Sequence, residues 1–179
     1  MANASKSFRI GLDIGGTGIK AGIVNPENQI IGRALHPTDS RRLWQQVVQE
    51  IVLTVQDALK DAGLTEQDCI SLGVGCPGTI DAKTGTVVYS NNLRWKNVPL
   101  VQELRHSFSL PIHVSNDANC AALGEVCAGA AKGCQYAVMF TLGTGVGSGI
   151  ILDGKIFEGG GPGGAEFGHT LLVENGELC

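Results

Sequence analysis

Two glycine-rich turns, at 13–20 and 141–149, constrain the fold of this chain more than any other feature. Their sequences are DIGGTGIK and TLGTGVGSG, and each lies between two short apolar segments typical of β-strands. A strand–turn–strand unit therefore opens both halves of the chain, which predicts an α/β protein whose halves begin alike. Because glycine has no Cβ, several backbone N–H groups of such a turn can approach one anion closely.

The two best-known phosphate-binding patterns do not match these turns. A dinucleotide-binding fingerprint opens a helix directly after a strand, whereas β-type residues follow both turns here. The P-loop pattern Gly-x-x-x-x-Gly-Lys-Ser/Thr is absent from the sequence. Either turn alone could be a tight hairpin that uses glycine for steric reasons. Asp13, Thr17 and Lys20 favour a phosphate loop, since they offer a carboxylate for water-bound Mg²⁺, a hydroxyl and a cation.

Hydrophobic periodicity predicts the remaining elements. We expect strands at 8–14, 20–25, 29–35, 69–76, 111–115, 137–141, 147–152 and 156–157, a hairpin at 79–90, a loop at 90–96, and helices at 40–62, 98–106 and 116–128. The first three strands should form an antiparallel meander, and Gly63 should end the first helix. No linker composition marks a boundary, so we place it near Asn116, between an N-terminal α/β domain (1–116) and the beginning of a second α/β domain (117–179).

Composition limits the class of protein. With 179 residues and 43% hydrophobic content, the chain can bury one sizeable core. Thirteen basic and seventeen acidic residues give a net charge of −4, and no basic run exists, so nucleic acid is not an expected partner. The N-terminal segment has neither a signal peptide nor a membrane span, which predicts a cytoplasmic protein without a membrane partner. The six scattered cysteines predict reduced, mostly buried thiols rather than a disulfide framework.

Asp117 is the candidate catalytic base, because Asn116 and Asp117 lie where an apolar strand gives way to a helix. A helix N-terminus stabilises the anionic form of a carboxylate, so we expect Asp117 to be ionised and a weakened base. Phosphoryl transfer tolerates a weak base, since positioning and charge neutralisation organise its transition state. An ordinary helix cap is the alternative. The two phosphate-type turns favour the catalytic interpretation.

Several polar side chains are suited to a polyol, because carboxylate and amide groups can bind two neighbouring hydroxyls. Each of them taken alone could be only a turn residue. The candidate sugar-binding residues are Asn92, Asn116, Asp117, Glu166 and His169.

The segments DIGGTGIK, SNN, SNDANCAALGE, TLGTGVGSGIILDGKI and GGPGGAEFGH resemble the ROK family of bacterial sugar kinases and repressors, and within it the members that phosphorylate glucose. The most specific part of the resemblance covers 142–169. It implies an actin-like ATPase (ribonuclease H-like) fold, in which two α/β domains hold ATP in the cleft between them.

The resemblance also implies a role for each candidate residue. Asp117 would be the catalytic base, and Asn92, Asn116, Asp117, Glu166 and His169 would contact a hexose. ATP and Mg²⁺ would bind two phosphate loops, the first formed by Asp13, Gly15, Gly16, Thr17 and Lys20 and the second by Gly143, Thr144, Gly145 and Gly147.

A structural zinc site is implied only in part. In the family, a histidine at the position of His169 binds Zn²⁺ together with cysteines of a Cys-x-Cys-Gly-x-x-Gly-Cys motif, and Cys179 stands where that motif begins. Structural zinc needs four ligands, so this chain alone should not bind it tightly. We therefore expect an N-terminal fragment of a longer protein, with little activity of its own.

The expected activity of the whole protein is ATP- and Mg²⁺-dependent phosphorylation of the 6-hydroxyl of a hexose, with glucose as the first candidate. One alternative is a sugar-responsive transcriptional repressor of the same family, and another is a kinase for a different hexose such as N-acetylmannosamine, fructose or allose. A different superfamily member that shares only the phosphate loops is disfavoured by Glu166 and His169. Family members often dimerise, which leaves a homodimer open.

Overall fold

The computed structural model describes residues 7–143, 145–161, 163–171, 173–174 and 176. Its strands are β1 (Phe8–Ile14), β2 (Gly18–Val24), β3 (Ile30–Pro37), β4 (Cys69–Cys76), β5 (Thr79–Asp81), β6 (Thr86–Ser90), β7 (Trp95–Val98), β8 (Ile112–Asn116), β9 (Ala137–Leu142), β10 (Val146–Leu152) and β11 (Lys155–Ile156). Its helices are α1 (Trp44–Asp61), α2 (Leu100–Leu104) and α3 (Asp117–Ala128), with 3₁₀ turns η1 (Glu66–Asp68) and η2 (Phe167–His169).

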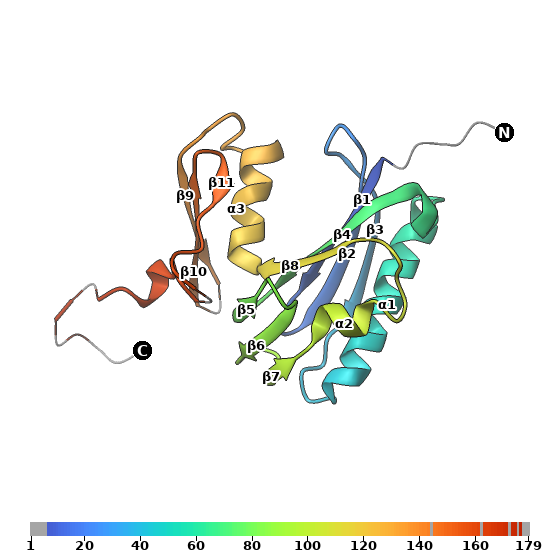
Figure 1. Cartoon of the computed structure of the whole chain (residues 1–179), viewed down its shortest axis with the longest axis horizontal. Helices are drawn as coiled ribbons and strands as arrows, with labels where there is room; N and C mark the ends of the chain where they lie inside the picture. The colour runs from blue at the N-terminus through green and yellow to red at the C-terminus, as the bar shows by residue number, and fades with distance from the viewer. Residues whose placement is uncertain (1–6, 144, 162, 172, 175, 177–179) are drawn as a thin grey trace.

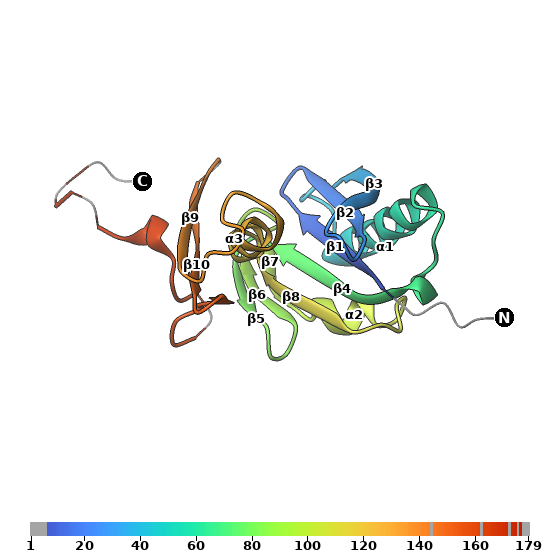
Figure 2. The same cartoon turned by 90° about the horizontal axis from the view of Figure 1, so that it is seen from above.

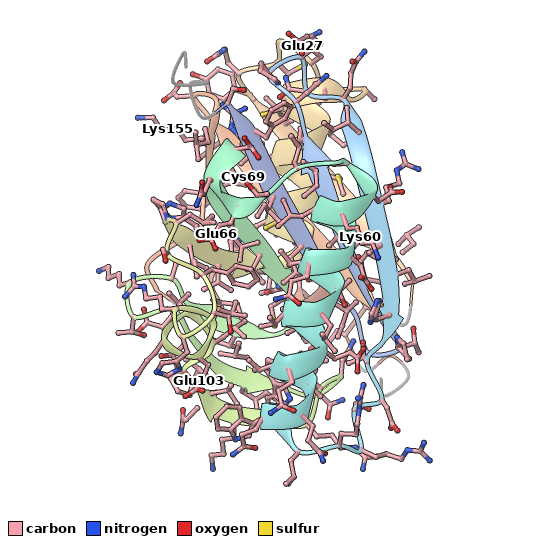
Figure 3. The ribbon with its side chains drawn as sticks, turned by 90° about the vertical axis from the view of Figure 1, so that its right-hand side faces the viewer. Glu27, Lys60, Glu66, Cys69, Glu103 and Lys155 are labelled. Carbon is pink, nitrogen blue, oxygen red and sulfur yellow. The ribbon has the colours of Figure 1, made fainter. Side chains whose placement is uncertain are left out.

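A five-stranded mixed sheet forms the main core, with the strand order β3-β2-β1-β4-β8. The strands β1, β2 and β3 pair antiparallel, which confirms the predicted meander, while β4 pairs parallel with both β1 and β8. Alternate residues of β1 and β2, such as Ile10 and Ile23, are buried. Helix α1 runs across one face of this sheet beside β3 (Figure 3). The carboxyl ends of β1, β4 and β8 therefore meet at one edge.

Helix α1 follows the periodicity that the sequence shows. Its buried residues include Val47, Ile51 and Val55, which recur at helical spacing. Gly63 has φ +67°, a left-handed conformation that suits glycine and ends the helix as predicted. The expected start at residue 40 is wrong, because the helix begins at Trp44.

A smaller antiparallel sheet, in the order β5-β6-β7, follows β4. The predicted hairpin at 79–90 is confirmed by the pairing of β5 with β6. The predicted loop at 90–96 is corrected, since β7 begins at Trp95 and pairs with β6. Trp95 and Val98 are buried and the two residues between them are exposed, so the strand lacks the alternation that would have revealed it.

Helix α3 lies between the five-stranded sheet and a three-stranded antiparallel sheet, β11-β10-β9 (Figures 1 and 2). The approach of α3 to β10 is close. A Cβ on Gly149 would lie 2.5 Å from the Cβ of Ala122, and a Cβ on Gly147 would lie 3.3 Å from the Cβ of Ala118. These glycines let the helix pack on the strand. The boundary that we propose near Asn116 falls at the start of this bridging helix.

The cysteine prediction is partly wrong. Cys69 and Cys76, on β4, are buried, whereas Cys120, Cys127 and Cys134 are exposed. The last three belong to α3 and the segment after it, where many of the described residues are exposed to solvent.

Within the described residues, no helix is both long and apolar enough to cross a membrane.

Candidate active site

Asn116 and Asp117 lie where β8 ends and α3 begins, as predicted. Asn116 caps the helix: its Oδ1 accepts hydrogen bonds from the N–H groups of Ala118 (2.9 Å) and Asn119 (3.3 Å). Its Nδ2 donates to the carbonyl oxygen of Gly78 at 3.3 Å, which ties the cap to the loop after β4. The side chain of Asn116 is therefore already occupied on two sides, and this fixes the start of α3 beside the β5–β6 hairpin.

Asp117 is half-buried, and its pKa is higher than that of an ordinary aspartate. Burial is the largest cause of the raised pKa; the N–H of Ala118, which donates to Oδ1 at 2.9 Å, opposes it, and the negative charge of Asp13 adds to it. The expectation that the helix N-terminus makes Asp117 a weakened base is therefore wrong, because burial and Asp13 outweigh the helix amide. A raised pKa makes the ionised carboxylate a stronger proton acceptor.

The first glycine turn joins β1 to β2. Asp13 and Lys20 face each other across this pair of strands, and Lys20 Nζ lies 3.1 Å from Asp13 Oδ2. Both side chains are more than half exposed, so the ion pair is weak and can open for a ligand. A Cβ on Gly16 would lie 3.5 Å from the carbonyl oxygen of Asn92, which places the turn next to the exposed loop between β6 and β7.

The second glycine turn joins β9 to β10, whose pairing ends at Leu142 and Val146. A Cβ on Gly143 or Gly145 would meet nothing within 4 Å among the described residues, so this turn is open on its outer side. None of the described glycines in either turn has a positive φ. The glycines thus provide room for close approach rather than an unusual backbone conformation.

Glu166 and His169 lie on the segment that follows β11, next to the second turn. The buried hydroxyl of Ser148, on β10, donates to the carbonyl oxygen of Ala165 at 3.0 Å and accepts from the N–H of Phe167 at 2.8 Å. The Phe167 ring stacks on Phe140 of β9, with ring centroids 6.2 Å apart. Ser148 therefore fixes the backbone on both sides of Glu166, a role that the sequence analysis missed.

These elements enclose a cavity of about 980 Å³, here called the polar cavity. It collects all five predicted sugar-binding residues together with the described part of the second turn. Its lining residues include Asn92, Asn116, Asp117, Gly143, Gly145, Gly147, Glu166 and His169. Amide, carboxylate and imidazole groups around one space of this size can bind a small polyhydroxyl ligand and fix its orientation.

A second cavity of about 930 Å³, here called the sheet groove, lies over β1, β2 and β3 beside α3. Asp13 and Lys20 line the sheet groove, and so does Asp117. Asp117 is the only described residue that lines both cavities. Gly15, Gly16 and Thr17 line neither cavity, and the structure brings them near the polar cavity only through the approach of Gly16 to Asn92.

Two predicted site residues, Thr144 and Cys179, lie outside the described residues. The described part of the chain holds no group of three or more His, Cys, Asp or Glu side chains that could bind a metal ion. His169 is exposed and has no second zinc ligand beside it among these residues, so the described residues alone do not supply the four ligands of a structural zinc site. Sequence reasoning also missed Glu158, which accepts a hydrogen bond from the Ser115 hydroxyl at 3.1 Å.

The comparisons with known proteins all indicate the same protein family. The family model described as "ROK family" matches residues 9–179. A glucokinase from Halalkalibacterium halodurans is 35% identical over 98% of this chain and 53% of its own length. A xylose repressor from Caldicellulosiruptor bescii is 35% identical over 70% of this chain and 31% of its own length. The chain thus spans about half the length of the curated glucokinase that it matches.

Among solved structures, a ROK family glucokinase from Streptomyces griseus in complex with glucose and AMPPNP superposes with a TM-score of 0.83. It is 38% identical, and the match covers 96% of this chain and 53% of the solved one. The expected actin-like ATPase fold is therefore confirmed for the part of that fold that this chain spans.

Proposed function

Because this chain belongs to the ROK family, we propose that the longer protein containing it transfers the γ-phosphoryl group of ATP to the 6-hydroxyl of a hexose. The observation that carries this proposal is the position of Asp117 between the polar cavity and the sheet groove. A hexose in the polar cavity would present a hydroxyl to Asp117, and ATP phosphates would approach from the side of Asp13 and Lys20. Glucose is the first candidate, since the similar glucokinases act on it.

The proposed chemistry assigns the proton to Asp117. Its carboxylate accepts the proton of the 6-hydroxyl as the hydroxyl oxygen forms a bond to the γ-phosphorus and the bond to the departing ADP breaks. The raised pKa of Asp117 supports this role, because it increases the affinity of the carboxylate for that proton. Asn92, Asn116, Glu166 and His169 hold the other hydroxyls, so that only one faces the phosphate.

The two glycine turns are the proposed phosphate-binding elements. The first turn, formed by Gly15, Gly16 and Thr17, would contact phosphate oxygens from one side through the backbone N–H groups of Gly16 and Thr17. The turn of Gly143, Thr144, Gly145 and Gly147 would contact them from the other side. Lys20 supplies positive charge beside the first turn. Asp13 is the carboxylate suited to hold Mg²⁺ through water, and the cation would neutralise charge on the phosphates.

The direct test is an assay of the full-length protein with MgATP and separate hexoses. We expect phosphorylation of glucose at the 6-position, measured by coupling glucose 6-phosphate to NADP⁺ reduction, and weaker turnover of mannose, fructose, N-acetylmannosamine or allose. Turnover of another hexose above glucose would correct the substrate and keep the reaction. No phosphorylation of any hexose by a folded, hexose-binding protein would overturn the kinase proposal.

A sugar-responsive repressor is the second candidate, because the similar xylose repressor shares 35% identity with this chain. A repressor would bind a sugar in the polar cavity and would bind operator DNA through a part of the protein outside this chain. Gel-shift assays of the full-length protein with its own upstream DNA, with and without sugar, distinguish a repressor from a kinase.

A kinase using ATP and hexose belongs in the cytoplasm, which is the location that we propose.

A further inference from the structure

Thr38 is a buried polar residue that none of the assignments above uses. It follows β3, and no part of it is exposed to solvent. Its hydroxyl donates a hydrogen bond to the carbonyl oxygen of Gly15 at 2.6 Å, and its N–H donates to the carbonyl oxygen of Thr17 at 3.2 Å. Thr38 therefore holds the first glycine turn at two carbonyl groups.

These two hydrogen bonds determine where the turn directs its amides. In a trans peptide the C=O and the following N–H point in opposite directions, so the carbonyl of Gly15 turned toward Thr38 directs the N–H of Gly16 away from it. The N–H of Gly15 is already used, since it donates to the carbonyl of Gly18 at 2.8 Å. Among the described residues, the N–H of Gly16 has no acceptor, which leaves it available to an anion.

Thr38 is itself anchored to α1. Its carbonyl oxygen accepts from Nη2 of Arg42 at 2.8 Å, and Nη1 of Arg42 lies 3.0 Å from Oε2 of Glu50. Oε1 of Glu50 in turn lies 2.6 Å from Nδ1 of His36. This chain of contacts runs from the glycine turn to the helix that packs beside β3 (Figure 3). The turn is thus connected through Thr38 and Arg42 to helix α1.

We propose that Thr38 is a positioning residue for phosphate binding: its hydroxyl holds the carbonyl of Gly15 so that the N–H of Gly16 faces the phosphates of ATP. The inference rests on the proposed kinase function and extends it to a residue that does not touch the substrate. The requirement is for a hydroxyl at this position, because valine has a similar shape but would leave the partly buried carbonyl of Gly15 without this hydrogen-bond donor.

The test compares three variants of the full-length protein. T38V removes the hydroxyl, T38S keeps it, and T54V is the matched control, since Thr54 is equally buried and its hydroxyl donates to the carbonyl of Glu50 within α1 at 2.7 Å. Binding of AMPPNP is measured by calorimetry, and KM for ATP and for hexose by the coupled assay. We expect T38V to weaken AMPPNP binding and raise KM for ATP about tenfold, with KM for hexose unchanged. T38S and T54V should stay within about twofold of the wild type.

A folded T38V variant that binds AMPPNP as tightly as T54V would overturn the inference while the kinase function stands. Equal weakening of ATP and hexose binding would also overturn it, because that pattern indicates general damage. If T38V does not fold, hydrogen exchange of the wild-type protein decides: AMPPNP should protect the N–H of Gly16, and an unprotected amide refutes the role. A wild-type protein that neither binds AMPPNP nor phosphorylates a hexose refutes the proposed function itself.

Discussion

Replacing Asp117 with Asn tests the assigned base while changing the shape of the site very little. Oδ1 of Asp117 accepts the N–H of Ala118 at 2.9 Å, so the amide of the variant must keep its oxygen at that position. Its NH₂ group then takes the place of Oδ2. A proton acceptor is replaced by a donor at the point where the polar cavity meets the sheet groove.

The expected loss is large and confined to turnover. Removing a general base costs about 10²- to 10⁴-fold in rate, which is about 2.7–5.4 kcal/mol of transition-state stabilisation. Hexose binding should change by less than about tenfold, because the amide can still hydrogen-bond a hydroxyl. The assay is kcat by the coupled reaction, together with the hexose Kd by calorimetry, on the full-length protein.

Asp68 supplies the matched control. Its Oδ2 accepts the N–H of Thr65 at 2.8 Å, and burial at Asp68 is outweighed by this bond, so its pKa is lowered. D68N therefore makes the same exchange of carboxylate for amide at a backbone N–H outside both cavities, and kcat should not change. A D117N variant that keeps more than about a tenth of wild-type kcat would refute the assignment of the base.

The remaining predictions concern the surroundings of Asp117. Because burial and Asp13 raise the pKa of Asp117, kcat/KM should fall as the pH drops through that raised pKa; a pH–rate profile of D13N should show this fall displaced to lower pH. S148A should raise KM for hexose about tenfold and leave KM for ATP unchanged in steady-state assays, because Ser148 fixes the backbone beside Glu166. N116A should lower the free energy of unfolding by about 1 kcal/mol in urea denaturation, and N116S should restore much of it. Chelating Mg²⁺ should abolish turnover and leave hexose binding intact by calorimetry.

The sequence predicted elements well where one local pattern decided them. Helix α1 and strand β4 follow hydrophobic spacing, and the end of α1 follows from Gly63, which has a positive φ in the structure. The start of α1 was misplaced because Arg42 turns back to donate to the carbonyls of Pro37 and Thr38. That contact depends on β3, which no pattern within 40–43 can reveal.

The candidate site was predicted by residue type and motif, and the structure gathers most of it around one cavity. The direction of the pKa shift at Asp117 could not be predicted from the sequence, because it depends on the burial of this side chain and on the charge of Asp13, which is distant in the chain. Thr38 and Ser148 were missed for a similar reason. Each is a single hydroxyl whose partners are distant in the chain, and the only local signal was a polar side chain at a buried position.

The most direct measurement of the central claim is a crystal structure of the full-length protein with a hexose and AMPPNP. The account predicts the hexose in the polar cavity with its 6-hydroxyl at hydrogen-bond distance, about 3 Å, from the carboxylate of Asp117. Glu166 and His169 should contact its other hydroxyls, and the N–H of Gly16 should contact a phosphate. A hexose bound elsewhere, or phosphates on the side of Asp117 away from Asp13 and Lys20, would contradict it.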